Sequence, residues 1–286
     1  MNEQQIKKDG VPSKVRNQKS GEALYLFCLA RGASLPIPME GNGVDNQHPL
    51  FLQNFRDIVA VLSMTSLKEF CGPEAESKMK DLEWMGPRVC RHEATIEQVM
   101  RHSPVLPVRY GTIFSSLESM DKFLWIHYHA IARFLDKVAD KEEWGVKVLL
   151  DRAKAREKLV ATMVAGRQKD LARLSAGKRY FEEQRIRTEA NKELTGWLRK
   201  VCKEIVDDLN RQVSDFRERR MVTHDFAKGD LKAIRNWAFL TPRKDAADFW
   251  AQVDRLNRVH AQEGLVIERS GPWPPYSFCP SLSEDR

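Results

Sequence analysis

Side chains that could take part in catalysis are concentrated in one stretch, RHEATIEQVMRHSPVLPVRYGTIF, which runs from Arg91 to Phe114. His92 and Glu93 are adjacent within it, and Arg88 and Arg109 lie close in sequence. A histidine, a carboxylate and two guanidinium groups could perform acid–base chemistry if a pocket joined them and shifted their titration. We favour another interpretation, in which they form a structural hydrogen-bonded network that ties a helix to a strand.

The remaining motifs predict no metal ion and no cofactor. His92 and Glu93 match the first two positions of an H-E-x-x-H zinc motif, but Ile96 occupies the position of the second histidine. His127 and His129 are two residues apart on a predicted helix, so they face different directions and cannot share a metal ion. The glycines form no phosphate-binding loop. Five scattered cysteines without a C-x-x-C spacing predict reduced thiols: Cys28, Cys71, Cys90, Cys202 and Cys279.

The positive charge of the chain is concentrated in one segment. The 286 residues carry a net charge of +7, and the segment from Asp151 to Arg220 holds 19 basic and 12 acidic residues, which accounts for the whole excess. No apolar run approaches the roughly 18 residues that a membrane-spanning helix needs. Residues 1–22 are polar and charged and are predicted to be a disordered leader.

The helices and strands predicted in the first half of the chain, which include the His92 stretch, indicate an α+β domain. Their order is β, β, α, β, α, which is typical of a sandwich with helices on one face of a mostly antiparallel sheet. The predicted strands are Ala23–Ala30, Ile58–Met64 and Val105–Phe114, and the predicted helices are Asp81–His102 and Ser116–Ala139.

The second half of the chain predicts a ferredoxin-like fold, because its elements follow the order β, α, β, β, α, β. The predicted strands are Trp144–Leu150, Arg219–Phe226, Asn236–Thr241 and Leu265–Ser270, and the predicted helices are Arg152–Phe216 and Asp245–Gln262.

The first of these helices is several times longer than the average helix of roughly 12 residues, so part of it must project as an arm or fold back. Gly177 is the predicted break. Beyond it, apolar residues at spacings of three and four form a narrow seam that suits a partner helix in a coiled coil. The seam consists of Leu194, Leu198, Val201, Ile205, Leu209 and Val213, and the next apolar position is Phe216. The basic arm could also bind nucleic acid, but its interleaved carboxylates favour a solvated or protein-contacting face.

The segment GPWPPYSF follows the last predicted strand. Its prolines predict an extended path that cannot continue a central strand. We expect its aromatic side chains to fold back as a clasp onto the sheet or the neighbouring domain. The segment consists of Gly271, Pro272, Trp273, Pro274, Pro275, Tyr276, Ser277 and Phe278.

Taken together, these motifs resemble the gas vesicle GvpL/GvpF family. The resemblance is carried by His92 and Glu93, by VLPVRYGTIF with Pro107, Arg109 and Gly111, and by the terminal GPWPPYSF, and it covers roughly Ala23 to Phe278. It implies two α+β domains, the first ferredoxin-like and the second with a long coiled-coil excursion. We place them at residues 23–140 and 141–278, with the arm at about 152–216 and a tail at 279–286.

The same resemblance implies a cytoplasmic, vesicle-associated accessory protein without catalytic activity. It implies binding to the hydrophobic main shell protein GvpA and to other accessory proteins, during nucleation or growth of the gas vesicle. The alternative from a different class is a nucleic-acid-binding regulator that uses the basic arm.

Overall fold

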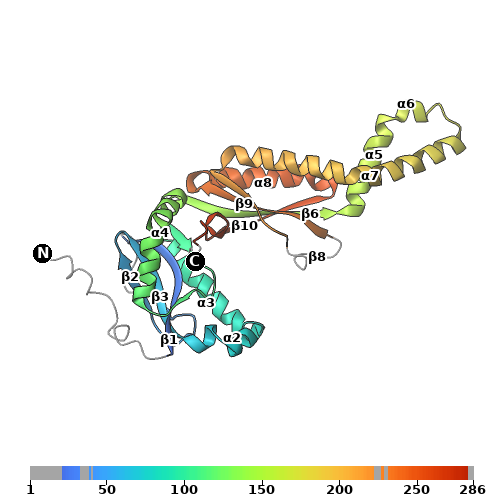
Figure 1. The fold of residues 1–286 in the computed structure, drawn as a ribbon. Coiled ribbons are helices and arrows are strands. Elements are labelled where there is room, and N and C mark those ends of the chain that lie inside the picture. Colours follow the sequence, from blue (N-terminus) through green and yellow to red (C-terminus); the bar gives the residue numbers. More distant parts are fainter. Residues whose placement is uncertain (1–20, 33–38, 40, 222–226, 229–230, 283–286) are drawn as a thin grey trace. The chain divides into compact units, whose positions relative to one another are not determined.

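The computed structural model describes residues 21–32, 39, 41–221, 227–228 and 231–282 (Figure 1). The chain divides into two compact units, of which the first combines residues up to Asp140 with those from Pro274 onward, and the second spans Lys141–Trp273. We expected the chain as far as Phe278 to belong to the C-terminal domain, so the return of the chain to the first unit at Pro274 corrects that boundary.

The first unit consists of an antiparallel sheet and helices. Its sheet has the order β2-β3-β1-β4, and β5 also pairs with β1. The strands are β1 (Glu22–Arg31), β2 (Leu50–Phe55), β3 (Ile58–Ser66), β4 (Val105–Pro107) and β5 (Ile113–Phe114). The helices are α1 (Leu67–Phe70), α2 (Pro73–Lys78), α3 (Leu82–Met100) and α4 (Leu117–Val138), and a short 3-10 helix, η6, spans Tyr276–Phe278.

Strand β1 is the centre of this unit, since each residue from Ala23 to Ala30 is fully buried. Tyr25 and Phe27 belong to the core cluster that contains residues of α3. Because side chains alternate along a strand, Leu24 and Leu26 point to the opposite face, and α4 also contacts β1. Helices therefore cover both faces of the sheet, not one face as we predicted.

The helix boundaries in this unit follow from capping residues. Asp81 caps α3 by accepting hydrogen bonds from the backbone N–H groups of Glu83 and Trp84. Ser116 and Ser119 form a reciprocal capping box at the start of α4. Both helices were predicted from the sequence, and their ends agree within two residues.

Two strands of this unit differ from the prediction. β2 was not predicted, and the expected single strand Val105–Phe114 is divided into β4 and β5. Pro104 and Pro107 lack the N–H group that a longer ladder needs. Gly111 then adopts a positive φ of 85°, which permits the turn between the two short strands.

The second unit is an antiparallel sheet of order β10-β6-β9-β7, with β8 paired to β9. The strands are β6 (Lys141–Asp151), β7 (Asp215–Glu218), β8 (Ala227–Lys228), β9 (Leu231–Pro242) and β10 (Leu265–Trp273). The helices are α5 (Arg152–Gly166), α6 (Gln168–Leu171), α7 (Ala176–Leu209) and α8 (Ala246–His260). The 3-10 helices are η3 (Asn210–Gln212), η4 (Arg243–Asp245) and η5 (Ala261–Glu263).

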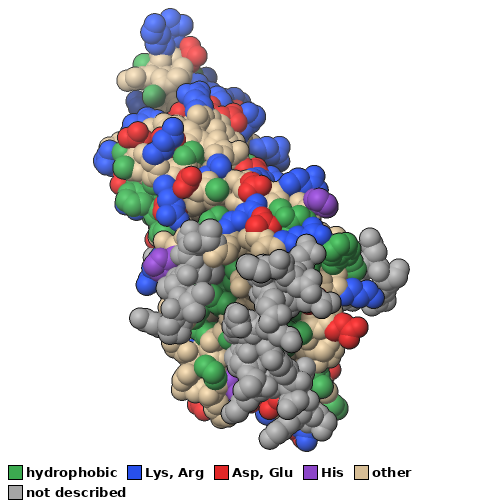
Figure 2. Space-filling model, turned by 90° about the vertical axis from the view of Figure 1, so that its left-hand side faces the viewer, with side chains coloured by type: hydrophobic (Ala, Val, Ile, Leu, Met, Phe, Trp, Pro, Cys, Tyr) green, Lys and Arg blue, Asp and Glu red, His purple; other side chains and the backbone are tan. Residues whose placement is uncertain are grey.

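Helices α5, α6 and α7 form a helical hairpin, so the long helical segment folds back, which is one of the two alternatives that we predicted (Figure 1). The chain reverses between α6 and α7, and Ser175 is the N-cap residue of α7. Gly177, the predicted break, lies inside the first turn of α7. Lys and Arg side chains are prominent at the upper end of the view in Figure 2, which is the end of the hairpin that carries α6 in Figure 1.

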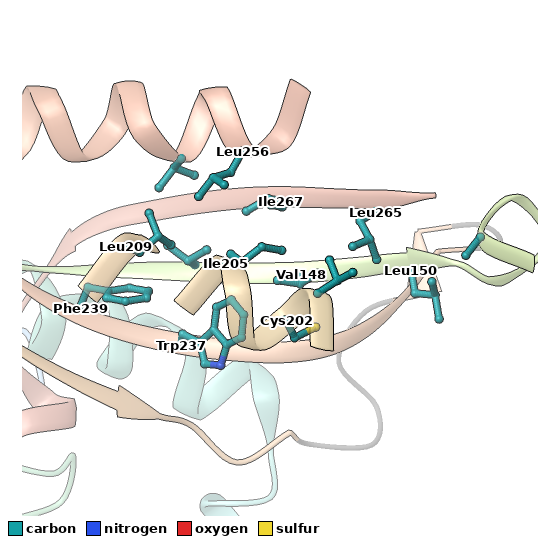
Figure 3. Close-up of a cluster of buried hydrophobic side chains, with 14 of the residues drawn as sticks. Val148, Leu150, Cys202, Ile205, Leu209, Trp237, Phe239, Leu256, Leu265 and Ile267 are labelled. Atoms are coloured by element: carbon teal, nitrogen blue, oxygen red, sulfur yellow. The ribbon is translucent and has the colours of Figure 1, made fainter. Parts of the chain in front are cut away.

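The apolar seam of α7 packs onto the sheet of its own unit. Ile205 and Leu209 lie beside Trp237 and Phe239 of β9 and Val148 of β6 (Figure 3). Of the six seam residues, four are buried in this core and two pack against it: Leu194, Val201, Ile205 and Leu209, and then Leu198 and Val213. The seam that we assigned to a partner helix is covered within the chain, by the strands of its own unit and by helix α5, which packs along α7.

The region after α7 also differs from the prediction. The helix ends at Leu209, and Phe216 lies in strand β7. The expected strand Arg219–Phe226 is displaced, because the ladder with β9 runs from Asp215 to Glu218. Residues 222–226 of that prediction lie outside the described residues.

Candidate functional site

Three motif segments that are far apart in sequence meet in the first unit. His92 on α3 is fully buried. Its Nδ1 atom lies 2.9 Å from the Tyr25 hydroxyl on β1, and its Nε2 atom lies 3.1 Å from the carbonyl oxygen of Val108. Because a carbonyl can only accept, Nε2 carries the proton of the neutral ring and Nδ1 accepts from Tyr25. The Tyr25 oxygen in turn accepts from the backbone N–H of Gly111 at 3.1 Å.

The C-terminal segment completes this set, which we call the His92 network: Tyr25, His92, Glu93 and Tyr276, with the backbone of Val108 and Gly111. The Tyr276 hydroxyl donates to Glu93 Oε1 at 2.8 Å and lies 3.4 Å from His92 Nε2. A residue near the C-terminus is thus hydrogen-bonded to a residue 183 positions earlier.

Burial sets the protonation states of the network. Loss of hydration lowers the pKa of His92 from 6.5 to about 4, although the hydrogen bond to Val108 opposes the shift. Burial also raises the pKa of Glu93, against the hydrogen bond from Tyr276, which lowers it. The pKa values of Tyr25 and Tyr276 are raised for the same reason, burial. At neutral pH the imidazole is therefore uncharged and both hydroxyls keep their protons.

The two arginines do not join the network. The Arg88 guanidinium pairs with Glu69 at 3.3 Å and lies over the Trp84 ring at 4.1 Å from its centroid. Arg109 is exposed, and its carbonyl oxygen accepts a hydrogen bond from Thr112 in the turn before β5. The four-residue acid–base cluster is therefore not assembled, and the side chains that hydrogen-bond to His92 and Glu93 are those of Tyr25 and Tyr276.

The aromatic residues of GPWPPYSF are divided between the two units. Trp273 pairs with Glu143 at the end of the β10–β6 ladder and is 43% exposed. Phe278 is buried in the first unit, where Lys137 lies 5.7 Å from the centroid of its ring. Pro274 and Pro275 are buried as well.

An exposed aromatic patch on α4 was missed by sequence reasoning. Trp125 and Ile126 are 66% and 61% exposed. Arg56, in the turn between β2 and β3, lies 4.6 Å from the centroid of the Trp125 ring and 4.5 Å from that of Tyr128. We call Phe55, Arg56, Trp125, Ile126 and Tyr128 the α4 patch. The sequence gives one sign of this patch: Trp125 and Ile126 lie outside the apolar face of the amphipathic helix.

Within the described ranges, no group of three or more His, Cys, Asp or Glu side chains is arranged to hold a metal ion. In the same part of the chain, every helix is too short or too polar to span a bilayer.

The fold is shared with a solved gas vesicle protein. It superimposes with a TM-score of 0.64 on the crystal structure of GvpF from Anabaena sp. PCC7120, with 19% sequence identity, over 91% of this chain and 96% of that one. The match to the family described as "Gas vesicle synthesis protein GvpL/GvpF" spans residues 23–280, and the chain belongs to this family.

Curated relatives agree with this assignment. The chain is 24% identical over 264 residues to gas vesicle protein L of Streptomyces sp. strain CB03234, covering 91% of this chain and 94% of the relative. It is also 24% identical over 277 residues to gas vesicle protein L1 of Halobacterium salinarum, covering 91% of each. The predicted resemblance is confirmed, and it implies a role in gas vesicle assembly.

Proposed function

We propose that the protein is a non-enzymatic assembly factor that binds the hydrophobic main shell protein GvpA and helps to nucleate or extend the vesicle wall. It acts in the cytoplasm and at the growing vesicle, together with other accessory proteins. The observation that carries the proposal is the α4 patch, an exposed apolar surface on a member of a gas vesicle family.

The α4 patch has the composition of an interaction surface. Trp, Tyr and Arg are the residues most enriched among those that dominate binding energies. Trp125 and Ile126 are adjacent and mostly exposed, and Arg56 packs over the neighbouring rings. Covering such side chains gains roughly 1.5–3 kcal/mol each, so a small hydrophobic protein is a suitable occupant.

The family motif has a different role in this proposal. His92 and Glu93, with Pro107, Gly111 and Tyr276, hold β1, α3 and the C-terminal segment together, so their substitution impairs folding first. The clasp that we predicted for GPWPPYSF is proposed for the part from Pro274 to Phe278, since the hydrogen bond of Tyr276 to Glu93 and the burial of Phe278 support it.

The binding test compares two double variants in a pull-down with purified GvpA. Trp125→Ser with Ile126→Ser is expected to reduce the captured GvpA about tenfold or more. Leu82→Ser with Val259→Ser removes two other exposed apolar side chains, 75% and 54% exposed, and serves as the matched control. Equal binding by both variants would exclude the α4 patch as the contact.

The role in assembly is tested separately in the producing organism. Deletion is expected to abolish or strongly reduce vesicles counted by electron microscopy, and the wild-type gene is expected to restore them. A deletion strain with normal vesicles, together with no GvpA capture by the purified protein, would refute the proposed function.

Nucleic-acid binding through the hairpin is the weaker candidate. Several hairpin cations are paired with carboxylates, including Arg179 with Glu183 at 3.1 Å and Arg185 with Glu182 at 2.8 Å. These carboxylates would lie close to the phosphates of a bound nucleic acid. A gel-shift titration that stays flat at low salt would remove this candidate.

We further propose that the second unit is a ferredoxin-like variant with the helical hairpin inserted after its first strand. Its sheet order, in which β6 lies between β10 and β9, supports this assignment. The first unit departs from such a fold, because its helices cover both faces of the sheet.

A further inference from the structure

The tip of the helical hairpin, residues 168–181, carries side chains that its own unit does not use. Tyr180 and Phe181 are 60% and 74% exposed, and Leu174 is 37% exposed. The buried side chains of α7 begin only at Ile186. Three large apolar side chains are therefore exposed within eight positions, and they do not contribute to the core of their unit.

Basic residues surround these apolar side chains. Residues 168–181 contain four basic residues and one acidic residue, Asp170. Lys169, Arg173 and Lys178 are exposed, and none of them forms an ion pair with a described residue. Further along the hairpin, by contrast, many cations are paired with carboxylates at helical spacing, as Lys203 is with Asp207.

The geometry of the hairpin holds this surface away from the sheet. Helix α7 has 34 residues, which corresponds to a length of about 50 Å, and its C-terminal part packs in the core of the unit. Directly before the tip, Arg167 makes a two-point contact with Glu189, with both N–O distances at 2.9 Å, and so ties α7 to the residue before α6. The tip is thus presented on a braced support.

We propose that the hairpin tip binds an acidic, amphipathic segment of a partner protein. Carboxylates of the segment pair with Lys169, Arg173 and Lys178, and an apolar side chain covers the rings of Tyr180 and Phe181, whose centroids lie 5.9 Å apart. Charge complementarity selects the partner and speeds its capture, and the aromatic side chains supply the anchor.

Other occupants fit less well. The phosphate backbone of a nucleic acid has no apolar surface to cover Leu174 and Phe181, which are 37% and 74% exposed. A lipid surface is also a poor occupant, because three apolar side chains give little insertion without a continuous apolar helix face. The inference does not depend on GvpA binding at the α4 patch, since the two surfaces share no residue.

The occupant can be identified by photo-crosslinking in the full chain. A photoreactive phenylalanine derivative replaces Phe181 in cells that assemble vesicles, and the same derivative replaces Leu82, another exposed apolar residue, as a position control. We expect position 181, and not position 82, to give a discrete adduct. The crosslinked peptide is expected to contain more Asp and Glu than Lys and Arg, and at least one large apolar residue.

Charge reversal then tests the basis of the contact. Lys169→Glu, Arg173→Glu and Lys178→Glu together are expected to reduce the adduct about tenfold or more. The matched control is Lys154→Glu, Lys158→Glu and Lys192→Glu, which makes the same change in net charge at exposed cations of the same hairpin. It is expected to change the adduct less than about twofold, and circular dichroism melting curves verify that both triple variants fold.

The proposal is overturned by an adduct with lipid or nucleic acid, by a crosslinked peptide that is neutral or basic, or by the absence of an adduct. Equal losses in the two triple variants would overturn it as well, because the contact would then depend only on net charge.

Discussion

Substitution of Tyr276 by Phe isolates the hydrogen bond that closes the His92 network. The ring stays in place, but the donor to Glu93 Oε1 at 2.8 Å is removed. A hydrogen bond to an ionised group contributes roughly 1.5–3 kcal/mol, and the half-buried carboxylate is left without this donor. We therefore expect Tyr276→Phe to lower the free energy of unfolding by about 2 kcal/mol at pH 8.

The sign of the pH dependence follows from Glu93. Burial raises its pKa in the folded state, and removal of the Tyr276 donor, which lowers the pKa, raises it further. A carboxyl group whose folded pKa lies above its unfolded value disfavours folding as the pH rises through the folded pKa. The cost of Tyr276→Phe is thus present at high pH and fades as the pH approaches the ordinary glutamate value of about 4.3.

Urea unfolding followed by circular dichroism at pH 8 and pH 5 measures both effects. Tyr180→Phe is the matched control, because Tyr180 is 60% exposed on the hairpin and makes no hydrogen bond through its hydroxyl to a described residue. If Tyr276→Phe costs no more than Tyr180→Phe, or costs the same at both pH values, the reasoning about Glu93 is refuted.

Three further predictions concern stability and use the same unfolding assay. Because burial lowers the pKa of His92 from 6.5 to about 4, wild-type stability is expected to fall by about 3 kcal/mol between pH 6.5 and pH 4, and His92→Gln to reduce this fall. Gly264 has φ 75° and a Cβ there would lie 2.6 Å from the Ala155 nitrogen, whereas a Cβ at helical Gly196 meets nothing within 4 Å. Gly264→Ala is therefore expected to destabilise by more than about 1 kcal/mol and Gly196→Ala to stabilise by about 0.5–1 kcal/mol; effects of the same sign would contradict this. Ile205→Ala is expected to cost about 2–5 kcal/mol, since Ile205 is fully buried, and a cost below 1 kcal/mol would contradict its place in the core.

Local patterns predicted most of the elements but not what covers them. The starts of α3 and α4 were predicted to within one residue, and in the structure the N-cap residues Asp81 and Ser116 fix them through hydrogen bonds to backbone within three residues. The seam of α7 was recognised but its covering elements, helix α5 and the sheet of its own unit, were not identified, because a stripe at spacings of three and four looks the same against a helix and against a sheet. The spacing of the apolar residues along α7 does not predict that they pack against β9.

The site was predicted least well where its contacts span the chain. His92 and Glu93 were singled out, but the pairing of Glu93 with Tyr276 joins positions 183 apart and has no local signal. Arg88 and Arg109 were placed in the cluster because they are near it in sequence. The turn at Gly111 instead leaves Arg109 in solvent, and Glu69 pairs with Arg88.

Buried motif residues and exposed surface residues should have separable effects in cells. The His92 network is buried or half-buried and joins three segments of the first unit, so its substitution is expected to lower both the amount of the protein and the number of vesicles, because an unstable fold is degraded. The α4 patch and the hairpin tip are exposed and contribute little to either core, so Trp125→Ser with Ile126→Ser is expected to reduce vesicles while the protein remains abundant. Immunoblotting beside vesicle counts measures both quantities. If the surface variant lost abundance as Tyr276→Phe does, or if Tyr276→Phe lost vesicles at full abundance, the division between a structural motif and a binding surface would be wrong.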